Sequence, residues 1–572
     1  MLAAQIGCGG GFSKSTASAG SDRVLITHTE NLSGDPALDG AARVVSHLVR
    51  SQLAGGRALS VFESAQESDA IQRRAGRIVR SWLDAEGGSL HLHVSVRSAQ
   101  NKTLEQWETV AAPADGPAML AAAIVKHLAP TASAGPRVPS EAAALFGQAL
   151  NAPGAGAIPL LEKAIAQAPA WGDAYYLLGA SLAASGKTDE ALSVWKEGMA
   201  RAGDEVSKTR MEIGIAAAMK QPEAAVEAHE RLAALLPSEP EISMQAGQLR
   251  LARSEFTKAV ALMKMAVEVD PAVGDWWNTL AFAQAFAGDE KAVFESIRRY
   301  EQLAPNSGNP PDSRGEIHFM LGQFKEASAS FGAAFGKDAN FLLGMTLLKS
   351  AQSLRMAGDA AGAEQEFQRY WNGPLKSHPL REFVRARWEF QGGKKEEAMR
   401  RVTAIATAPS TAPDLASACW TQIAWWHLAA GDRAKALEAA NSALQKAKAI
   451  PAKRDAAVAL YLAQPSATVE EWKRRAKGNP PADLLALALV FDHKWKDAVP
   501  VLGDLAARTH PFRAGHWRVL YAWALLETGQ IEKAREWLRW YPIPLSSGGD
   551  TIEPLVMEKA LELRTRALVR KG

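Results

Sequence analysis

The chain has 572 residues, 47% of them hydrophobic, and its 65 Lys and Arg against 62 Asp and Glu give a formal charge of +3. This apolar content excludes wholesale disorder, and the length predicts three or four domains or one extended array. A nearly neutral chain without a dense basic stripe argues against nucleic acid as a partner. No apolar stretch reaches the roughly 18 residues of a membrane-spanning helix.

Residues 1–21 predict a flexible tail rich in Gly, Ser and Thr. The small and apolar residues ending in Gly7-Cys8 resemble the end of a bacterial lipoprotein signal, but a basic start and a long apolar stretch are missing. Two readings stay open. Either the natural start lies upstream and lipid on Cys8 tethers the protein to the cell envelope or periplasm, which would be its one link to a membrane, or the tail is free and the protein cytoplasmic.

Residues 22–130 have the pattern of a small α/β domain. Runs with period two or β-branched residues predict strands, and apolar residues at helical spacing predict helices. The expected strands are 23–28, 59–62, 77–83, 89–97 and 104–110, and the expected helices are 38–53, 70–74 and 119–128. Glu86-Gly-Gly88 predicts a hairpin turn between two of the strands.

Two features of this domain carry a resemblance to a known family. They are Asn31-Leu-Ser-Gly-Asp35 followed by Leu38-Asp39, and the hairpin from Gly87 to Arg97. On these residues the domain resembles the TolB amino-terminal-like domain, although Thr27-His28-Thr29 stands where that family has Pro-Phe. The resemblance implies a module that often precedes helical repeats in bacterial regulators. It therefore keeps open an alternative function as a regulatory or sensory module of a signalling system.

A repeat begins after a Pro-, Ala- and Ser-rich linker at 131–139. Prolines recur at intervals of 34 residues or twice 34, and alanines keep the same interval. The prolines are Pro169, Pro237, Pro271 and Pro305, with Gly203 at the missing step, and the alanines are Ala157, Ala191, Ala225 and Ala259. A proline after a helix prevents the helix from continuing, so each proline predicts a helix end.

A second mark is a Gly followed by an Ala five residues later. It occurs at Gly186/Ala191, Gly322/Ala327, Gly358/Ala363, Gly393/Ala398, Gly431/Ala436 and Gly529/Ala534. Such a Gly ends the first helix of a hairpin in a left-handed conformation, and small residues let the two helices approach closely.

The best single unit has Tyr175, Leu178, Gly179, Gly186, Ala191, Trp195 and Gly198. It resembles the tetratricopeptide repeat (TPR), a helical hairpin of 34 residues. The fold expected is thus mainly α: a TPR α-solenoid, a right-handed superhelix of helical hairpins, preceded by the small α/β domain. We expect roughly 11 to 12 hairpins over residues 140–545 and a capping helix in 546–572.

The sequence contains no phosphate-binding Gly-rich loop, no His-Glu-x-x-His and no paired Cys-x-x-Cys. We therefore predict no catalytic residues, no cofactor and no metal. His91 and His93 share one face of a strand, but a third metal ligand is not evident. Cys419, in a helical run, is expected to be a buried small hydrophobe.

Tryptophan is enriched in the repeats, where 15 of the 17 lie between Trp171 and Trp540. In a TPR the first helix of each pair lines a groove, and aromatic and Arg side chains are typical of protein-binding hot spots. Counting back from the turn glycines, the groove candidates are Tyr176, Asn278, Phe282, Arg355, Trp425 and Trp523. Core packing is the alternative role for these residues. The function predicted is a non-enzymatic scaffold that binds a protein or peptide, as an extended segment or an amphipathic helix.

Overall fold

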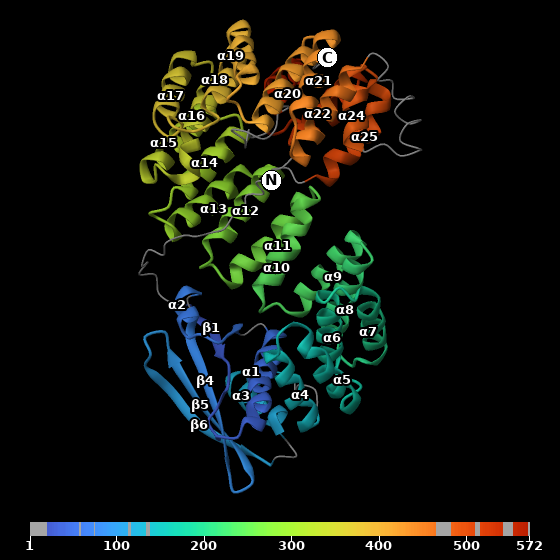
Figure 1. Cartoon of the computed structure of the whole chain (residues 1–572). Helices are drawn as coiled ribbons and strands as arrows, with labels where there is room; N and C mark the ends of the chain where they lie inside the picture. The colour runs from blue at the N-terminus through green and yellow to red at the C-terminus, as the bar shows by residue number, and fades with distance from the viewer. Residues whose placement is uncertain are drawn as a thin grey trace. The chain divides into compact units, whose positions relative to one another are not determined.

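The computed structural model (Figure 1) describes residues 20–56, 59–73, 75–112, 116–132, 138–464, 482–509, 515–541 and 553–569. The chain forms two compact units. The N-terminal unit holds the described residues up to Arg250 together with Phe256–Leu280, and the C-terminal unit holds Leu251–Glu255 together with the described residues from Ala281 onward. Cys8 and the rest of the predicted tail up to residue 19 lie outside the described residues.

The N-terminal unit starts with the predicted α/β domain. Its strands are β1 (Gly20–Thr27), β2 (Glu30–Asn31), β3 (Ser60–Ser64), β4 (Ala75–Glu86), β5 (Ser89–Ser98) and β6 (Thr103–Ala111). Its helices are η1 (Pro36–Leu38), α1 (Asp39–Ala54), α2 (Ser68–Gln72) and α3 (Gly116–Leu128). The expectation of a small α/β domain is confirmed; the sequence analysis missed only the two-residue β2 and the single turn η1.

The sheet has the order β3-β1-β4-β5-β6, with β2 paired to β4 off this path. β1 runs parallel to β3 and β4, and β4, β5 and β6 are antiparallel. Along β5 the side chains alternate: Leu90, Leu92 and Val94 are buried, whereas His91 and His93 stay partly exposed on the other face. One face of the sheet therefore carries the core, as period-two patterning predicts.

Helices joined by short loops follow, as the fold-class prediction requires. The helices that belong wholly or in part to the N-terminal unit are α4 (Ser140–Asn151), η2 (Gly154–Ala157), α5 (Ile158–Gln167), α6 (Gly172–Ala184), α7 (Thr188–Arg201), α8 (Glu205–Ala218), α9 (Pro222–Leu235), α10 (Pro240–Ala252), α11 (Phe256–Val269) and α12 (Gly274–Ala287).

The C-terminal unit continues the series of helical hairpins. Its helices are α13 (Glu290–Leu303), α14 (Asn309–Met320), α15 (Phe324–Lys337), η3 (Phe341–Gly344), α16 (Met345–Met356), α17 (Ala360–Asn372), α18 (Arg381–Gln391), α19 (Lys395–Thr407), α20 (Pro413–Ala429), α21 (Arg433–Lys446), α22 (Ile450–Ala463), α24 (Ala482–Phe491), α25 (Trp495–Arg508), α26 (Gly515–Glu527), α27 (Ile531–Trp537) and α28 (Glu553–Val569).

The repeat prolines and turn glycines lie at the helix ends and turns that the repeat predicts. Helices α5, α9, α11 and α13 end at Gln167, Leu235, Val269 and Leu303, each two residues before one of the four repeat prolines. The six turn glycines all have positive φ, between 78° and 84°. The chain is therefore a solenoid of TPR-type helical hairpins, which confirms the predicted fold class.

Close helix approach within a hairpin depends on residues without large side chains. A Cβ atom on Gly179 in α6 would overlap the indole of Trp195 in α7. A Cβ atom on Gly198 would lie 2.5 Å from Tyr175 Cβ and 2.5 Å from Met211 Sδ in the next hairpin. Trp195 Nε1 donates a hydrogen bond to the carbonyl oxygen of Tyr176 at 3.2 Å, so the indole fills the space left by the glycine.

The far end of the C-terminal unit packs against its own first helices. The Tyr541 amide donates to the Met320 carbonyl at 2.8 Å, and Arg539 Nη1 donates to the Ala287 carbonyl at 3.3 Å. The rings of Phe286 and Trp540 lie 4.8 Å apart. These contacts join segments more than 200 residues apart in sequence, and repeat periodicity alone gives no signal for them.

A Gly179→Ala substitution tests the packing of the hairpin. We expect it to destabilise the N-terminal unit by about 1–3 kcal/mol, because the added methyl group forces the Trp195 indole to move. Chemical denaturation monitored by tryptophan fluorescence measures the change. Gly332→Ala in α15 is the control, because a Cβ there meets nothing within 4 Å and alanine favours a helix interior by about 0.5–1 kcal/mol. Equal effects of the two changes would contradict the packing argument.

Candidate interaction surfaces

The six groove candidates divide between the two units. Tyr176 on α6 and Asn278 on α12 belong to the N-terminal unit, and Phe282, Arg355, Trp425 and Trp523 belong to the C-terminal unit. Each set is described within its own unit.

The first hairpins of the N-terminal unit are packed against the α/β domain. Helix α1 lies against α4, where a Cβ on Gly147 would overlap the Gly40 carbonyl and a Cβ on Gly40 would overlap the Ala144 carbonyl. One hydrophobic core runs from the sheet through α1 and α4 to α6 and α7. The domain and the hairpins are thus a single packed body in this unit.

Three arginines of the α/β domain bind acidic residues of the repeats. Arg23 pairs with Asp270, Arg73 with Glu241, and Arg50 Nη2 lies 2.5 Å from Glu239 Oε2. Arg23 and Asp270 are 6% and 2% exposed, so this pair is buried. Burial, together with the charge of Arg73, lowers the pKa of Arg23 to about 9. Removing one partner of such a pair leaves an uncompensated buried charge, so the pairs fix where the domain docks.

Tyr176 lies next to this docking region. The guanidinium of Arg210 is 5.9 Å from its ring, and Arg210 Nη1 lies 3.4 Å from Asp173 Oδ1. Burial acts to raise the pKa of Asp173, but the nearby His47 ring, the charge of Arg210 and a hydrogen bond from Ser207 Oγ at 3.2 Å outweigh it and bring the pKa to about 2. The Asp173 carboxylate therefore stabilises the fold at pH values above the ordinary aspartate pKa. This stability is lost as the pH falls toward about 2.

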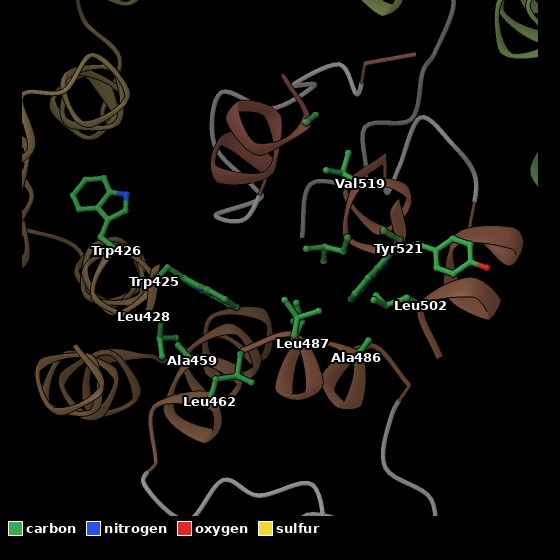
Figure 2. Close-up of a cluster of buried hydrophobic side chains, with 14 of the residues drawn as sticks. Trp425, Trp426, Leu428, Ala459, Leu462, Ala486, Leu487, Leu502, Val519 and Tyr521 are labelled. Carbon is green, nitrogen blue, oxygen red and sulfur yellow. The ribbon is translucent and has the colours of Figure 1, made fainter. Parts of the chain in front are cut away.

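Phe282 and Trp425 take the alternative role of core packing and not that of groove residues, because both are buried, at 6% and 4% exposure. Figure 2 shows Trp425 of α20 pointing into a cluster with Leu462 and Leu487, and its ring lies 6.0 Å from that of Phe491. A side chain packed in this way stabilises the core and offers almost no contact surface. Asn278 is half-buried, and its Oδ1 atom is buried without a hydrogen-bond partner.

Arg355 is held by its neighbours. Its guanidinium lies 3.4 Å from the ring centre of Trp388, and it donates to Gln391 Oε1 at 3.1 Å and to the Trp388 carbonyl at 3.2 Å. Trp388 is stacked in turn on Phe367 at 4.5 Å. Since these bonds occupy its donors within the hairpin stack, the structure assigns Arg355 to packing between hairpins rather than to an open groove.

Trp523 is the candidate that keeps a partly exposed side chain among other aromatic residues. Its ring lies 5.0 Å from that of Trp495, and Trp495 lies 5.4 Å from His493. Lys559 Nζ is 4.3 Å from the Trp523 ring, and Trp523 Nε1 donates to Glu527 Oε1 at 3.1 Å. We call His493, Trp495 and Trp523 the aromatic patch; all three are partly or fully exposed. Counting in the repeat locates Trp523, but only the structure shows that the α24–α25 turn supplies its neighbours.

A second feature of the C-terminal unit is a buried charge cluster. Lys349 Nζ donates to Asp312 Oδ2 at 2.8 Å and to Glu316 Oε1 at 2.6 Å, and all three residues are buried. Burial, opposed by the charge of Lys349 and assisted by that of Glu316, raises the pKa of Asp312 to about 6. Burial acts to lower the pKa of Lys349, but the two carboxylates outweigh it and raise that pKa above the ordinary lysine value. The sequence analysis did not find this cluster, because its members lie on two different helices, α14 and α16.

The remaining chemistry is sparse. Glu108 lies beside both strand histidines, with Oε1 2.5 Å from His91 Nδ1 and Oε2 3.9 Å from His93 Nδ1. Within the described ranges, no group of three His, Cys, Asp or Glu side chains is arranged to hold a metal ion. Cys419 is buried as expected, and burial raises the pKa of its thiol to about 12. No helix in the described part of the chain is both long and apolar enough to span a membrane.

Known structures resemble parts of this chain at low sequence identity. No protein-family model matches the chain, and no curated protein matches it. Among solved structures, the C-terminal part of a TPR repeat-containing protein from Cytophaga hutchinsonii is 15% identical, with 42% of this chain and 94% of that chain covered and a TM-score of 0.34. Naa15/Naa10 bound to HypK-THB is 14% identical over 75% of this chain and 73% of that chain, with a TM-score of 0.33.

A third structure is YrrB, described as a TPR protein with an unusual peptide-binding site. It is 15% identical over 33% of this chain and 86% of that chain, with a TM-score of 0.23. Two of these three structures are described as TPR proteins, and the likeness concerns the helical fold alone. The similarity of residues 22–130 to the TolB amino-terminal-like domain stays a prediction.

A Lys349→Met substitution tests the charge cluster. At about pH 7.5 it leaves two carboxylates buried without a cation, and we expect a loss of about 3–5 kcal/mol in unfolding free energy. Without the Lys349 charge, nothing opposes the burial and the Glu316 charge that raise the pKa of Asp312. The variant therefore takes up a proton at a higher pH than the unchanged protein, and the loss shrinks at about pH 5. Chemical denaturation at both pH values, each against the unchanged protein, measures this.

The control for this test is Lys325→Met. Lys325 is exposed on the neighbouring helix α15, so its removal costs no more than about 0.5 kcal/mol at either pH. A loss for Lys349→Met that is the same at both pH values would refute the titration of the cluster.

Proposed function

We propose that this protein is a non-enzymatic scaffold that binds a protein or peptide through the aromatic patch of its C-terminal unit. The observation that carries the proposal is the partial exposure of Trp495 and Trp523 on a surface whose neighbouring tryptophans, Trp425 and Trp426, are buried. Tryptophan is the residue type most enriched among interface hot spots, and a rigid pair of indoles offers a large contact area at small entropic cost.

The surroundings of the patch suit a ligand with apolar side chains and a charged rim. Lys559 and Glu527 lie beside Trp523, and Arg566 Nη2 pairs with Glu527 Oε1 at 2.9 Å. The indoles are therefore bordered by charged side chains, and the apolar side chains of a ligand can cover the indoles inside this rim. An extended segment or the apolar face of an amphipathic helix fits this description.

Attachment to the cell envelope through lipid on Cys8 remains part of the proposal as an anchor rather than as a binding function. It is tested by the membrane fractionation of the natural gene product against Cys8→Ser. A regulatory role would use the same binding surface to report on the ligand.

The binding proposal is tested with peptides selected from a random display library against the full chain. A hot-spot indole is worth about 2 kcal/mol or more, so we expect Trp523→Ala to weaken a selected peptide about 30-fold. Trp523→Phe keeps a ring and gives a smaller loss. Calorimetric titration of the synthetic peptide measures the affinities.

Trp277→Ala is the matched control. Trp277 is a half-buried tryptophan of the N-terminal unit, whose Nε1 donates to the Pro271 carbonyl at 2.9 Å, and its loss leaves the affinity unchanged. Circular dichroism and thermal unfolding verify that each variant folds. The proposal fails if no peptide is enriched, or if the selected peptides bind the folded Trp523→Ala variant as tightly as the unchanged chain.

A further inference from the structure

In the described part of the chain, no strand pairs with the outer edge of the last strand of the sheet. β6 pairs with β5 along its length and ends the sheet order. Most of its residues are exposed, while Trp107 and Thr109 are half-buried and Ala111 is buried. Helix α3 covers one face of the strand, where the His127 ring is stacked on Trp107 at 3.9 Å. The outer row of backbone N–H and C=O groups faces away from β5, as in any edge strand.

Natural edge strands are usually protected by lysine, proline, bulges or shortness. The other edge of this sheet, β3, has only five residues. By contrast, β6 has nine residues, and none is Lys or Pro. The register shifts at its start, where Val96 pairs with Glu105 but Arg97 pairs with Thr103, so the stretch from 105 to 111 is regular. A regular, exposed edge of this length is a template for another strand.

The side chains of β6 suit one particular partner, which is a second β6. We propose that two copies of this chain associate by antiparallel pairing of their β6 strands about a twofold axis at Trp107. Each Glu105 is then opposite Thr109 of the second copy, and each Gln106 is opposite Glu108. The two most exposed apolar side chains of the strand, Leu104 and Val110 at 48% and 46%, are opposite each other.

The neighbouring registers are worse. A shift that centres the axis on Glu105 or on Glu108 places two carboxylates directly opposite each other, which is destabilising. Centring it on Gln106 places Leu104 opposite Glu108 and leaves Val110 opposite Lys102. The register at Trp107 is thus the one among these that opposes no like charges and pairs the exposed aliphatic side chains with each other.

Such pairing joins the two sheets into one continuous sheet across the axis. It also places two aromatic patches in one assembly, so a ligand whose two binding segments reach both patches gains affinity without any new contact. The pairing itself does not depend on the proposed function, because β6 and the aromatic patch share no residues.

The first test is the mass of the full chain in solution. Light scattering over about a hundredfold range of concentration is expected to approach twice the monomer mass of 61.2 kDa. Leu104→Lys combined with Val110→Lys places two cations directly opposite each other on both sides of the axis, at positions that are 48% and 46% exposed in one copy, and keeps the chain monomeric. Leu32→Lys, at a 58% exposed position off the strand, leaves the dimer intact. A monomer at every concentration, or a dimer that the edge variant leaves unchanged, overturns the proposal.

The second test fixes the register by disulfide formation in a Cys8→Ser background, in which the remaining Cys419 is buried. Gln106→Cys with Glu108→Cys places each new thiol opposite one of the second copy. Opposed Cα atoms lie about 4.5–5.5 Å apart, within reach of a disulfide.

Gln106→Cys with Val110→Cys is the mismatched control. Its closest cysteines are diagonal neighbours across the two strands, and these residues lie about 7–8 Å apart. We expect covalent dimers on non-reducing gels for the first pair only. Equal cross-linking of both pairs, or cross-linking of the control alone, overturns the register.

Discussion

Close contact between helices at residues without side chains is the constraint on which the rest of this structure depends. In the hairpin α6–α7, Gly179 makes the space that the Trp195 indole fills. The same device recurs between α1 and α4, where Gly40 and Gly147 bring two backbones together. Because one kind of contact builds the hairpins and attaches the α/β domain, both share one hydrophobic core rather than two adjoining ones.

Local signals in the sequence predicted the ends of the helices well. The repeat prolines and turn glycines act within a few residues of themselves, so they predict helix ends without knowledge of tertiary contacts. The same logic fails at three turns, where Lys220, Ser254 and His493 take the left-handed conformation with φ of 54° to 58°. No glycine marks those positions, so the sequence analysis found the helices on either side but not the turn conformation.

The candidate site was harder to predict, because burial depends on residues far away in sequence. Position in the repeat selects the helix face of Trp425, but Leu487, from a later helix, lies in the cluster that buries it. Arg355 is engaged by Trp388, which lies on a different hairpin. Trp523 keeps its exposure since its neighbours come from a turn and from α28. Aromatic composition therefore identified a set of residues, and packing decided which of them can meet a ligand.

The arginine contacts of the α/β domain change the interpretation of residues 131–139 as a linker between two independent parts. By composition it is a linker between two modules, yet α1 and α4 pack closely across it and Arg23 neutralises Asp270 on the far side. The ends of a helical solenoid need a cover over their exposed apolar face, and here the α/β domain supplies it. In a fragment starting at residue 140, Gly147 of α4 would lose its contact with Gly40, and the Asp270 carboxylate would lose its partner Arg23. The two parts thus differ in their sequence patterns but share one hydrophobic core.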